Sequence, residues 1–305
     1  MTISSQFSND AVTQHPVHSL TSGYRLTWRQ RKLLVKRPSQ QHPVFFLPHH
    51  QPDRLTECLS RSPVSLLKLD LDLGENQICA WADASAYAHK PVYLRLRQCP
   101  NLPKQIHPNQ WWIKRSLDWL MALLLLILLS PLMLSVAGLI KFYSPGPILF
   151  TQWRIGERGK LFRIIKFRTM IVGADRLHHR VMCNQPGLHK LPNDPRITRI
   201  GYLLRKYSLD ELPQLINVLR GEMSLVGPRP WALYDAGRIK PELRHRLNAL
   251  PGITGLWQVE SRSQQRDLNL VNHQDLTYLH TWSLWNDLRI LIVTIPKVFS
   301  GFGSY

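Results

Sequence analysis

Two adjacent carboxylates, Asp210 and Glu211, have the residue types and spacing best suited to chemistry in this sequence. They lie in "SLDELPQ", residues 208–214. As local structure, Ser208 followed three residues later by Glu211 is a capping box, which predicts a helix start at Ser208. As chemistry, neighbouring carboxylates at a helix start, with many Arg and Lys nearby in the sequence, form a place where a phosphate could be held and attacked.

Basic side chains on both sides of this pair are candidates for binding the phosphate. In "FRIIKFRT", alternation with a period of two places Lys166 and Arg168 on one face of a strand, where a solvated basic face is an equally good interpretation. Arg205 belongs to "RITRIGYLLRK", a basic element just before the carboxylates. Arg229 stands between two prolines in "VGPRP", which limits the entropy lost when its guanidinium grips a phosphate.

A glycine-rich segment, "PGITGLWQV" at residues 251–259, supplies a further candidate. It places Gln258 beside Trp257, a pair suited to a loop that approaches a base or a sugar. Each of these motifs is a weak signal alone, whereas their order within one segment is informative.

An apolar segment at residues 119–140 precedes these motifs and runs for 22 residues without a charge, the length of a helix that crosses a bilayer core. Its interior pair Ser130 and Pro131 predicts a break or a kink, because proline removes a backbone donor and clashes with the preceding turn. The Ser hydroxyl can bond the carbonyl that is left without its partner.

Three interpretations of this segment are open: a kinked spanning helix, a re-entrant helix hairpin at about 115–141, and, less favoured, a buried helix of a soluble protein. Basic residues flank it on both sides, so the distribution of charge does not fix its orientation. Only the re-entrant hairpin leaves the basic segments before and after it together in the cytosol, which favours that form.

The chain of 305 residues carries 39 Lys and Arg against 20 Asp and Glu, a formal charge of +19. This excess predicts an anionic partner: nucleic acid, a lipid head-group surface or a phosphorylated substrate. The four cysteines are widely spaced, which indicates reduced thiols rather than a zinc site or a disulfide framework. The first twenty residues have no signal-peptide pattern, so we expect the N-terminus to stay in the cytoplasm.

Residues 1–110 are expected to be an extension, polar and poorly ordered up to about 41 and then a small α/β module at about 43–98. Strands are predicted at "HPVFFLP", "SLLKLDLDL", "ICAWADA" and "PVYLRLR", and a helix at "PDRLTECLSR". "YRLTWRQRKLLVKR" is compatible with a basic strand or a short helix. His49 and His50 have no third ligand at useful spacing, so a solvated loop is favoured over a metal site.

The C-terminal segment "TWSLWNDLRILIVTIPKVF" has apolar residues near helical spacing. It predicts an amphipathic helix at a membrane interface, with a packed core helix as the alternative. The residues concerned are Trp282, Trp285, Leu288, Ile292 and Ile295.

Residues 111–305 resemble the bacterial polyprenyl-phosphate hexose-1-phosphate transferases, also called monotopic phosphoglycosyl transferases. The resemblance covers nearly two thirds of the chain, and residues 1–110 lie outside it. The motifs that carry it are "KRSLDW", "SPGPILFTQWRIG", "KFRTM", "NDPRITRIG", "LRKYSLDELPQLINVLRGEMSLVGPRP", "PGITGLWQV" and "DLTYLHTWSLWNDLRILIVTIPKV".

The resemblance implies an α+β fold, in which a re-entrant membrane hairpin carries a small mixed α/β cytosolic catalytic domain on the cytoplasmic face of the inner membrane. It implies transfer of a sugar-1-phosphate from a UDP-sugar to polyprenyl (undecaprenyl) phosphate, with release of UMP, as the initiating step of exopolysaccharide or glycoconjugate synthesis. Asp210 is then the nucleophile that forms a phosphoryl-aspartate, Glu211 its partner, and both bind Mg²⁺. Substrate binding falls to Lys166, Arg168, Arg205, Arg229 and Gln258, with Ser130 and Pro131 at the re-entrant break.

Other interpretations give different expectations. A non-catalytic membrane-docked scaffold would keep the same motifs for folding only, and a basic nucleic-acid binder would account for the charge, although we expect no nucleic acid as a partner. Within enzymes, the lipid phosphate could attack directly without a covalent step. A homo-oligomer is compatible with all of these.

Overall fold

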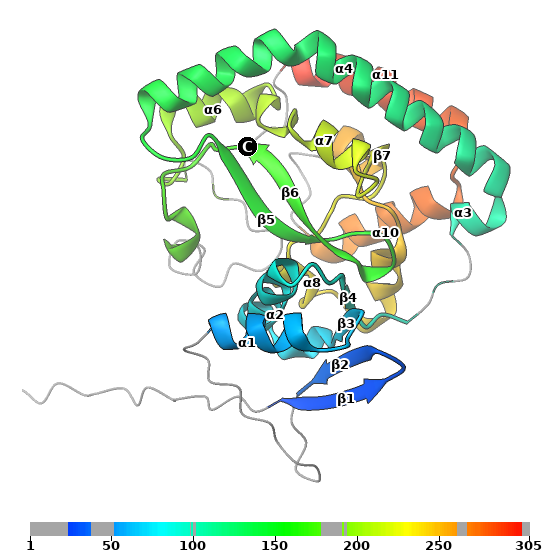
Figure 1. The fold of residues 1–305 in the computed structure, drawn as a ribbon. Coiled ribbons are helices and arrows are strands. Elements are labelled where there is room, and N and C mark those ends of the chain that lie inside the picture. The colour runs from blue at the N-terminus through cyan, green and yellow to red at the C-terminus, as the bar shows by residue number, and fades with distance from the viewer. Residues whose placement is uncertain are drawn as a thin grey trace, which may run out of the picture.

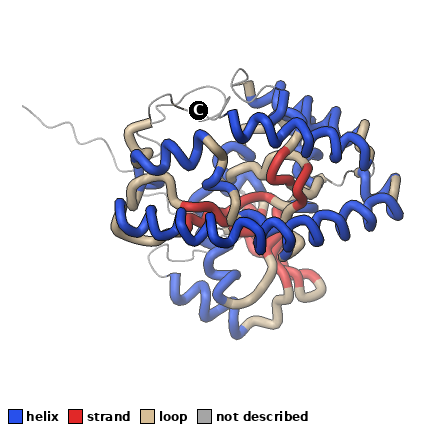
Figure 2. Tube along the Cα trace, turned by 90° about the horizontal axis from the view of Figure 1, so that it is seen from above, coloured by secondary structure: helices blue, strands red, loops and turns tan. Residues whose placement is uncertain are grey.

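The computed structural model describes residues 24–37, 52–97, 99, 102–177, 191, 194–260 and 267–300. Helices cover the top of the molecule, and the strands lie beneath them (Figures 1 and 2). The strand expected at "HPVFFLP" and the histidine pair after it lie outside the described residues.

The N-terminal module, residues 24–97, is a four-stranded sheet in the order β1-β2-β3-β4 with two helices. β1 and β2 form an antiparallel hairpin, and β3 and β4 add to it in parallel. Its elements are β1 (Arg25–Arg29), β2 (Lys32–Lys36), α1 (Pro52–Arg61), β3 (Leu66–Leu69), η1 (Leu71–Leu73), α2 (Glu75–Tyr87) and β4 (Val92–Leu94).

Two expectations about this module need correction. Its sheet begins at Arg25, not near residue 43, because "YRLTWRQRKLLVKR" forms the β1–β2 hairpin. "ICAWADA" was predicted as a strand, and this is wrong: it lies in α2. The buried residues Ile78, Trp81, Ala82 and Ser85 follow the i, i+3, i+4, i+7 spacing of a helix. The helix predicted at "PDRLTECLSR" is confirmed as α1.

The remainder of the chain mixes helices with short strands, in agreement with the predicted α+β class. β5 and β6 form one antiparallel pair, and β7 and β8 form a parallel pair. The elements are α3 (Pro103–Ile106), α4 (Pro108–Tyr143), β5 (Leu149–Ile155), η2 (Glu157–Gly159), β6 (Leu161–Phe167), η3 (Ala174–Leu177), α6 (Arg199–Lys206), η4 (Leu209–Glu211), α7 (Gln214–Leu219), β7 (Ser224–Val226), α8 (Leu233–Ala236), η5 (Pro241–Asn248), β8 (Gly252–Thr254), α9 (Leu256–Glu260), α10 (Leu268–His280) and α11 (Leu284–Ser300).

Residues 149–167 form the β5–β6 ribbon, an antiparallel hairpin that turns at "GERG". A two-stranded ribbon is marginally stable alone, so it needs other partners. The fully buried Asn217 of α7 supplies one: its Oδ1 accepts from the Ile165 N–H at 3.0 Å, and its Nδ2 donates to the Arg163 carbonyl at 2.9 Å. One amide side chain therefore pairs with β6 as a neighbouring strand would.

The apolar segment forms part of α4, which runs for 36 residues without a break. The expected helix–break–helix is thus replaced by one helix that changes direction along the top of the molecule (Figure 1). Pro131 lies inside it and cannot donate to the Ile127 carbonyl four residues earlier. Ser130 Oγ donates to that carbonyl at 2.8 Å, which confirms the predicted compensation and keeps the helix continuous.

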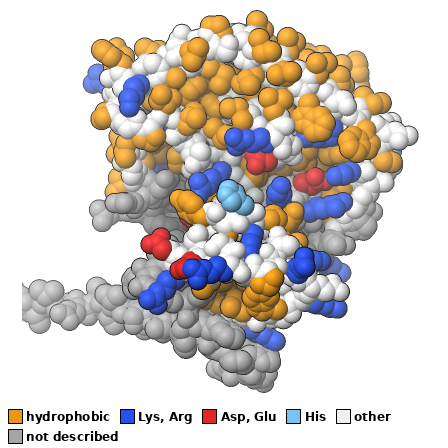
Figure 3. Space-filling model, in the orientation of Figure 1, with side chains coloured by type: hydrophobic (Ala, Val, Ile, Leu, Met, Phe, Trp, Pro, Cys, Tyr) orange, Lys and Arg blue, Asp and Glu red, His pale blue; other side chains and the backbone are white. Residues whose placement is uncertain are grey.

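Both ends of α4 pack on the globular part, whereas most side chains of its middle are exposed. Ala122 in the first half and Val136 and Ile140 in the second half are buried. The 18 most apolar consecutive positions are only 11% buried, and α4 is the one described helix long and apolar enough to cross a membrane. Hydrophobic side chains accordingly predominate over the upper part of the surface, and most of the charged ones on this face lie below (Figure 3).

A buried network of charges fixes the first half of α4. Lys114 Nζ donates to Asp287 Oδ2 of α11 at 2.6 Å and to the Val226 carbonyl at 3.1 Å. Arg115 Nη1 donates to Asp118 Oδ2 at 3.1 Å, and Asp118 also accepts from the main chain of β7. The basic residues before the apolar segment therefore anchor the helix.

The C-terminal segment confirms the expected amphipathic helix, with one difference. In α11, Trp285, Leu288, Ile292 and Ile295 are exposed. Trp282 precedes the helix and is buried, where its Nε1 donates to Asp287 at 3.2 Å.

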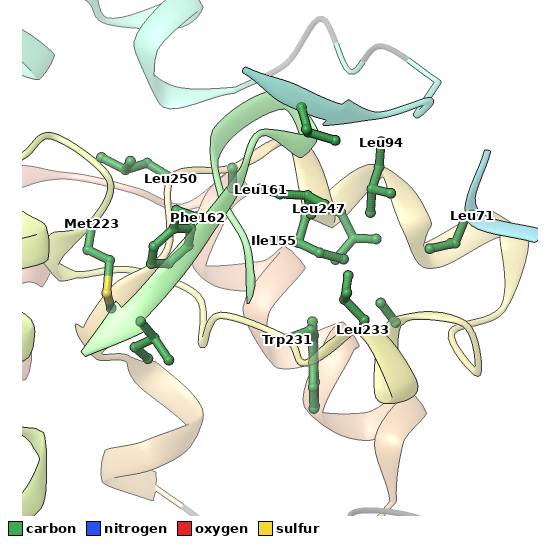
Figure 4. Close-up of a cluster of buried hydrophobic side chains, with 14 of the residues drawn as sticks. Leu71, Leu94, Ile155, Leu161, Phe162, Met223, Trp231, Leu233, Leu247 and Leu250 are labelled. Atoms are coloured by element: carbon green, nitrogen blue, oxygen red, sulfur yellow. The ribbon is translucent and has the colours of Figure 1, made fainter. Parts of the chain in front are cut away.

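One hydrophobic core joins the N-terminal module to the remainder of the chain. Leu71 and Leu94 of the module belong to the same buried cluster as Ile155, Leu161 and Trp231 (Figure 4). The module is therefore not an independent appendage.

The bridging role of Asn217 generates a prediction. Asn217→Ala leaves the buried Ile165 N–H and the part-buried Arg163 carbonyl without this partner, so it should lower the free energy of unfolding by about 2 to 4 kcal/mol. Thermal unfolding in detergent measures this. Asn109→Ala, at an exposed position of α4, is the control and should change nothing. An unchanged unfolding temperature for Asn217→Ala would contradict the bridge.

Candidate active site

The carboxylate pair lies in a short 3-10 turn, η4, and not at the start of an α-helix. The predicted capping box is wrong: Ser208 has left-handed backbone angles (φ 53°, ψ 20°), and its side chain makes no cap hydrogen bond within the described part of the chain. The α-helix begins only at Gln214, after Pro213. The Glu211 carboxylate points instead to Lys166.

The two leucines that flank the pair attach it to α4. Leu209 and Leu212 pack against a small buried cluster that contains Val136 and Ile140 of α4. Phe167 and Leu204 complete this cluster. Asp210 and Glu211 thus lie one residue away from side chains that pack on the same cluster as the second half of α4.

Lys166 makes the central ion pair of the site. Its Nζ lies 2.7 Å from Glu211 Oε1, and the two side chains are 16% and 12% exposed. Burial lowers the pKa of Lys166 below its ordinary value, while the charges of Glu211 and Asp210 oppose this shift. Asp210 itself is buried, with 9% of its surface exposed.

Arg205 brings a second cation to the pair. Burial lowers its pKa, and Asp210 is the first of the negative charges that oppose this shift. Its Nε donates to Thr169 Oγ1 at 2.9 Å, which fixes the guanidinium beside the end of β6.

Arg229 approaches from the loop after β7. Its carbonyl accepts from Arg246 Nη2 at 2.7 Å, and Arg246 is held in turn by a buried ion pair with Asp275. The Arg229 guanidinium lies over the Trp257 ring, 5.9 Å from its centroid. The loop between the two prolines is therefore fixed by its main chain, which leaves the side chain to reach the site.

Lys166, Glu211 and Arg229 line a narrow cleft between the β5–β6 ribbon and the β7–β8 pair. Gln258 does not line it: its Nε2 donates to the Ile253 carbonyl at 3.3 Å, so it supports the cleft wall. The lining residues are Arg154, Ile164, Lys166, Glu211, Gln214, Arg229, Pro230, Gly252 and Ile253.

The glycines of this wall are needed for close backbone packing. A Cβ on Gly252 would lie 2.1 Å from the Gly227 nitrogen, and a Cβ on Gly255 would lie 2.4 Å from the Gly227 oxygen. Only glycine allows the "PGITG" segment to lie directly against "VGPRP", and this contact sets the position of Arg229.

Arg168 was expected beside Lys166, but its side chain lies at the end of α4. Its guanidinium donates to the carbonyls of Ser144 at 2.6 Å and Pro145 at 3.1 Å, at the end of α4. β6 ends at Phe167, so the strand alternation that placed Arg168 beside Lys166 does not extend to it. Arg168 therefore fixes the exit from the long helix.

Arg154 is the cleft residue that sequence reasoning missed. It lies opposite Phe162 in the β5–β6 register, which places it on the same ribbon face as Lys166. Its Nη2 donates to Gln152 Oε1 at 2.6 Å, and its charge interacts with Glu211. Pairing the strands across "GERG" from the sequence would have found it.

A buried acid lies on the other side of Arg154. Asp235 of α8 is buried, and this burial raises its pKa to about 6, although Arg154, Arg238 and Arg229 oppose the shift. The pKa of the neighbouring Tyr234 is also raised by burial.

The donor set at the pair fits Mg²⁺. This ion prefers oxygen ligands and commonly takes one or two carboxylates together with substrate phosphates and water. Asp210 and Glu211 supply two such carboxylates. Within the described ranges, no group of three or more His, Cys, Asp or Glu is gathered, so the substrate and water would complete the coordination.

The site therefore combines two carboxylates with cations from four segments: Arg154 on β5, Lys166 on β6, Arg205 on α6 and Arg229 after β7. This surplus of positive charge around an acidic pair suits a substrate with several negative charges, such as a diphosphate.

Comparison with known families identifies the class. The model of a family described as bacterial sugar transferase matches residues 109–301, which include the carboxylate pair and its cations. This chain belongs to that family, as the motifs predicted, and it is a transferase enzyme.

Named relatives agree with this class. An exopolysaccharide production protein ExoY of Sinorhizobium fredii is 44% identical over 199 residues, 63% of this chain and 88% of the relative. ExoY of Rhizobium meliloti is 41% identical over 234 residues, 73% of this chain and 99% of the relative. A UDP-glucose:undecaprenyl-phosphate glucose-1-phosphate transferase of Caulobacter vibrioides is 44% identical over 203 residues, 63% of this chain and 72% of the relative.

The raised pKa of Asp235 predicts a pH-dependent stability. Between an unfolded pKa of about 4 and the folded value of about 6, the folded chain holds a proton that the unfolded chain has lost. Stability conferred by this group therefore falls as the pH rises through that window. Asp235→Asn stays neutral and should raise the free energy of unfolding at pH 7.5 by about 2 kcal/mol.

Thermal unfolding at pH 7.5 and pH 5 measures this effect. The gain should shrink by about half at pH 5. Asp53→Asn, at an exposed position of α1, is the matched control variant. An equal gain at both pH values would contradict the shift.

Proposed function

We propose that this protein transfers a sugar-1-phosphate from a UDP-sugar to undecaprenyl phosphate through a phosphoryl-aspartate on Asp210, as the initiating step of exopolysaccharide synthesis. The observation that carries the proposal is the Asp210–Glu211 turn, which cations surround and whose flanking residues Leu209 and Leu212 pack on the buried cluster that α4 shares. The relatives named as acting on undecaprenyl phosphate and as exopolysaccharide production proteins support the substrate class.

In the first step, an Asp210 carboxylate oxygen attacks the phosphorus bonded to the sugar. The bond from this phosphorus to the bridging oxygen breaks, and UMP leaves with that oxygen. Lys166, Arg205, Arg154 and Arg229 reduce the repulsion between the carboxylate and the diphosphate. Their positions are fixed before the substrate arrives, so little reorganisation is needed.

In the second step, a phosphate oxygen of undecaprenyl phosphate attacks the same phosphorus. The bond to the Asp210 oxygen breaks, which restores the carboxylate and releases the lipid-linked sugar diphosphate. The covalent intermediate divides the meeting of a soluble nucleotide sugar with a membrane lipid into two simpler encounters.

Mg²⁺ would be held by Asp210 and Glu211. When bound, it would neutralise part of the diphosphate charge. Lys166 keeps Glu211 in place for that role through the 2.7 Å ion pair.

A re-entrant position of α4 fits this chemistry. At 1.5 Å per residue, its 36 residues measure roughly 54 Å, well beyond a hydrocarbon core of about 30 Å. A straight spanning helix would leave its two ends on opposite sides, whereas Lys114 and Ile140 both contact the same globular part. The exposed middle of the helix would then dip into the inner membrane, with the site at the cytoplasmic face.

Asp210→Asn tests the nucleophile. Loss of the attacking carboxylate should reduce UMP release from UDP-sugar plus undecaprenyl phosphate by at least about 10³-fold. A panel of UDP-sugars, including UDP-glucose and UDP-galactose, provides the assay. The unfolding temperature of the variant should stay close to that of the wild type, and unchanged UMP release would contradict the role of Asp210.

Mass spectrometry of the enzyme with UDP-sugar, without lipid acceptor, extends this test. A sugar-phosphate adduct should form on Asp210 in the wild type and be absent in Asp210→Asn. If a wild type that turns over with lipid forms no adduct, the lipid phosphate attacks directly.

The topology of α4 can be tested with single cysteines in a cysteine-free background. Asn109→Cys and Phe142→Cys, near the two ends of α4, should both react with a membrane-impermeant reagent added from the cytoplasmic side only. Reaction of one end from the periplasmic side would show a spanning helix. High salt should leave the protein in membrane pellets, and detergent should release it.

A further inference from the structure

The β5–β6 ribbon is contacted by a part of the chain that lies outside the region matching the family. The family match begins at residue 109, and the R. meliloti relative is matched over 99% of its length while covering 73% of this chain. The N-terminal module therefore lies largely outside what the family shares. It nevertheless contacts the ribbon that carries two of the site's cations.

The tip of the ribbon rests on the edge of the module's sheet. Lys160 forms an antiparallel bridge with Tyr93 of β4. Gly159 has a φ of +77°, and a Cβ there would lie 2.9 Å from the Leu94 carbonyl, so glycine is required for this close approach. Lys104 Nζ also lies 3.0 Å from Glu157 Oε1 at the same tip.

One carboxylate of α2 accepts hydrogen bonds from the middle of both strands of the ribbon. Asp83 Oδ1 accepts from Trp153 Nε1 of β5 at 2.8 Å and from Arg163 Nη2 of β6 at 2.7 Å. Arg163 in turn lies over the Trp153 ring, with its Cζ 4.9 Å from the centroid. A single oxygen of the module thus connects both strands.

These contacts lie on the ribbon face opposite the cleft. Trp153 pairs with Arg163 in the register, whereas Arg154 and Lys166 point to the other face. The cleft residues Arg154, Ile164 and Lys166 confirm this assignment. A change in the position of Trp153 and Arg163 on that face would therefore move Arg154 and Lys166 on the cleft face.

We propose that the N-terminal module is part of the catalytic apparatus, and that Asp83 is a positioning residue that sets Lys166 and Arg154 for the diphosphate by holding the back of the ribbon. The proposal rests on the proposed function for what these cations bind. It gives residues 24–97 a role in substrate binding, although none of them lines the cleft.

The strength of the contact favours positioning over stabilisation. Asp83 and Arg163 are 47% and 46% exposed, and an ion pair this accessible to water adds little to the free energy of folding. The shared core already joins the module to the ribbon. Asp83 instead fixes the orientation of its two donors, the Trp153 indole and the Arg163 guanidinium. Catalysis is sensitive to displacements of about 1 Å.

The test compares four variants of the full chain: Asp83→Ala, Trp153→Phe, the double variant that combines them, and the control Asp53→Ala at an exposed acid on α1 of the same module. Asp83→Ala should lower kcat/KM for the UDP-sugar by about 10-fold, mostly through KM, with the unfolding temperature within about 2 °C of the wild type. Trp153→Phe removes one donor and should have a smaller effect in the same direction. The double variant should resemble Asp83→Ala alone, because the two changes break one connection.

A second readout does not depend on activity. Amide hydrogen exchange in residues 149–167 should become several-fold faster in Asp83→Ala than in Asp53→Ala, with exchange in residues 252–254 unchanged. Wild-type kinetics and wild-type exchange in Asp83→Ala would overturn the proposal. A loss of activity that follows only the fraction of folded protein would also overturn it. If the wild type releases no UMP from any UDP-sugar, the proposed function fails, and the exchange comparison alone decides whether Asp83 holds the ribbon.

Discussion

Mutual repulsion between negative charges is the constraint on which this structure depends. Asp210 and Glu211 are neighbours in one turn, and two carboxylates this close repel each other unless positive charge surrounds them. The chain meets this requirement with cations from elements far apart in sequence. Among them, Lys166 forms a direct ion pair with Glu211. The ribbon, the "VGPRP" and "PGITG" segments and α6 are arranged so that these cations converge on the turn.

Much of the fold follows from local pattern, and the errors have identifiable causes. Ser130 could be assigned to a main-chain carbonyl because Pro131 leaves the one at Ile127 without a donor. That rule is local, but whether the helix breaks or bends depends on what its two halves pack against. The strand expected at "ICAWADA" failed because the short window hid a period of 3.6 residues.

The position of a site residue could be predicted where it depends on a single segment of the sequence. The carboxylates, Lys166 and Arg205 were found from motifs. The capping box failed because Glu211 has a stronger partner in Lys166, which is distant in sequence. Arg168 was misplaced since the end of β6 is set by tertiary contacts. Predicting the position of Arg154 requires the register between β5 and β6. A hairpin turn implies this register, whereas a single strand does not show it.

The boundary of the family and the boundary of the folded unit do not coincide. The family begins at residue 109, yet the hydrophobic core continues back to Leu71 and Leu94 (Figure 4). An expression fragment cut at that boundary would expose Ile155 and Leu161 to water on a second apolar surface, separate from the exposed middle of α4. Such a fragment would require a substitute for the missing layer, so the shortest protein that retains this core must include the first strands.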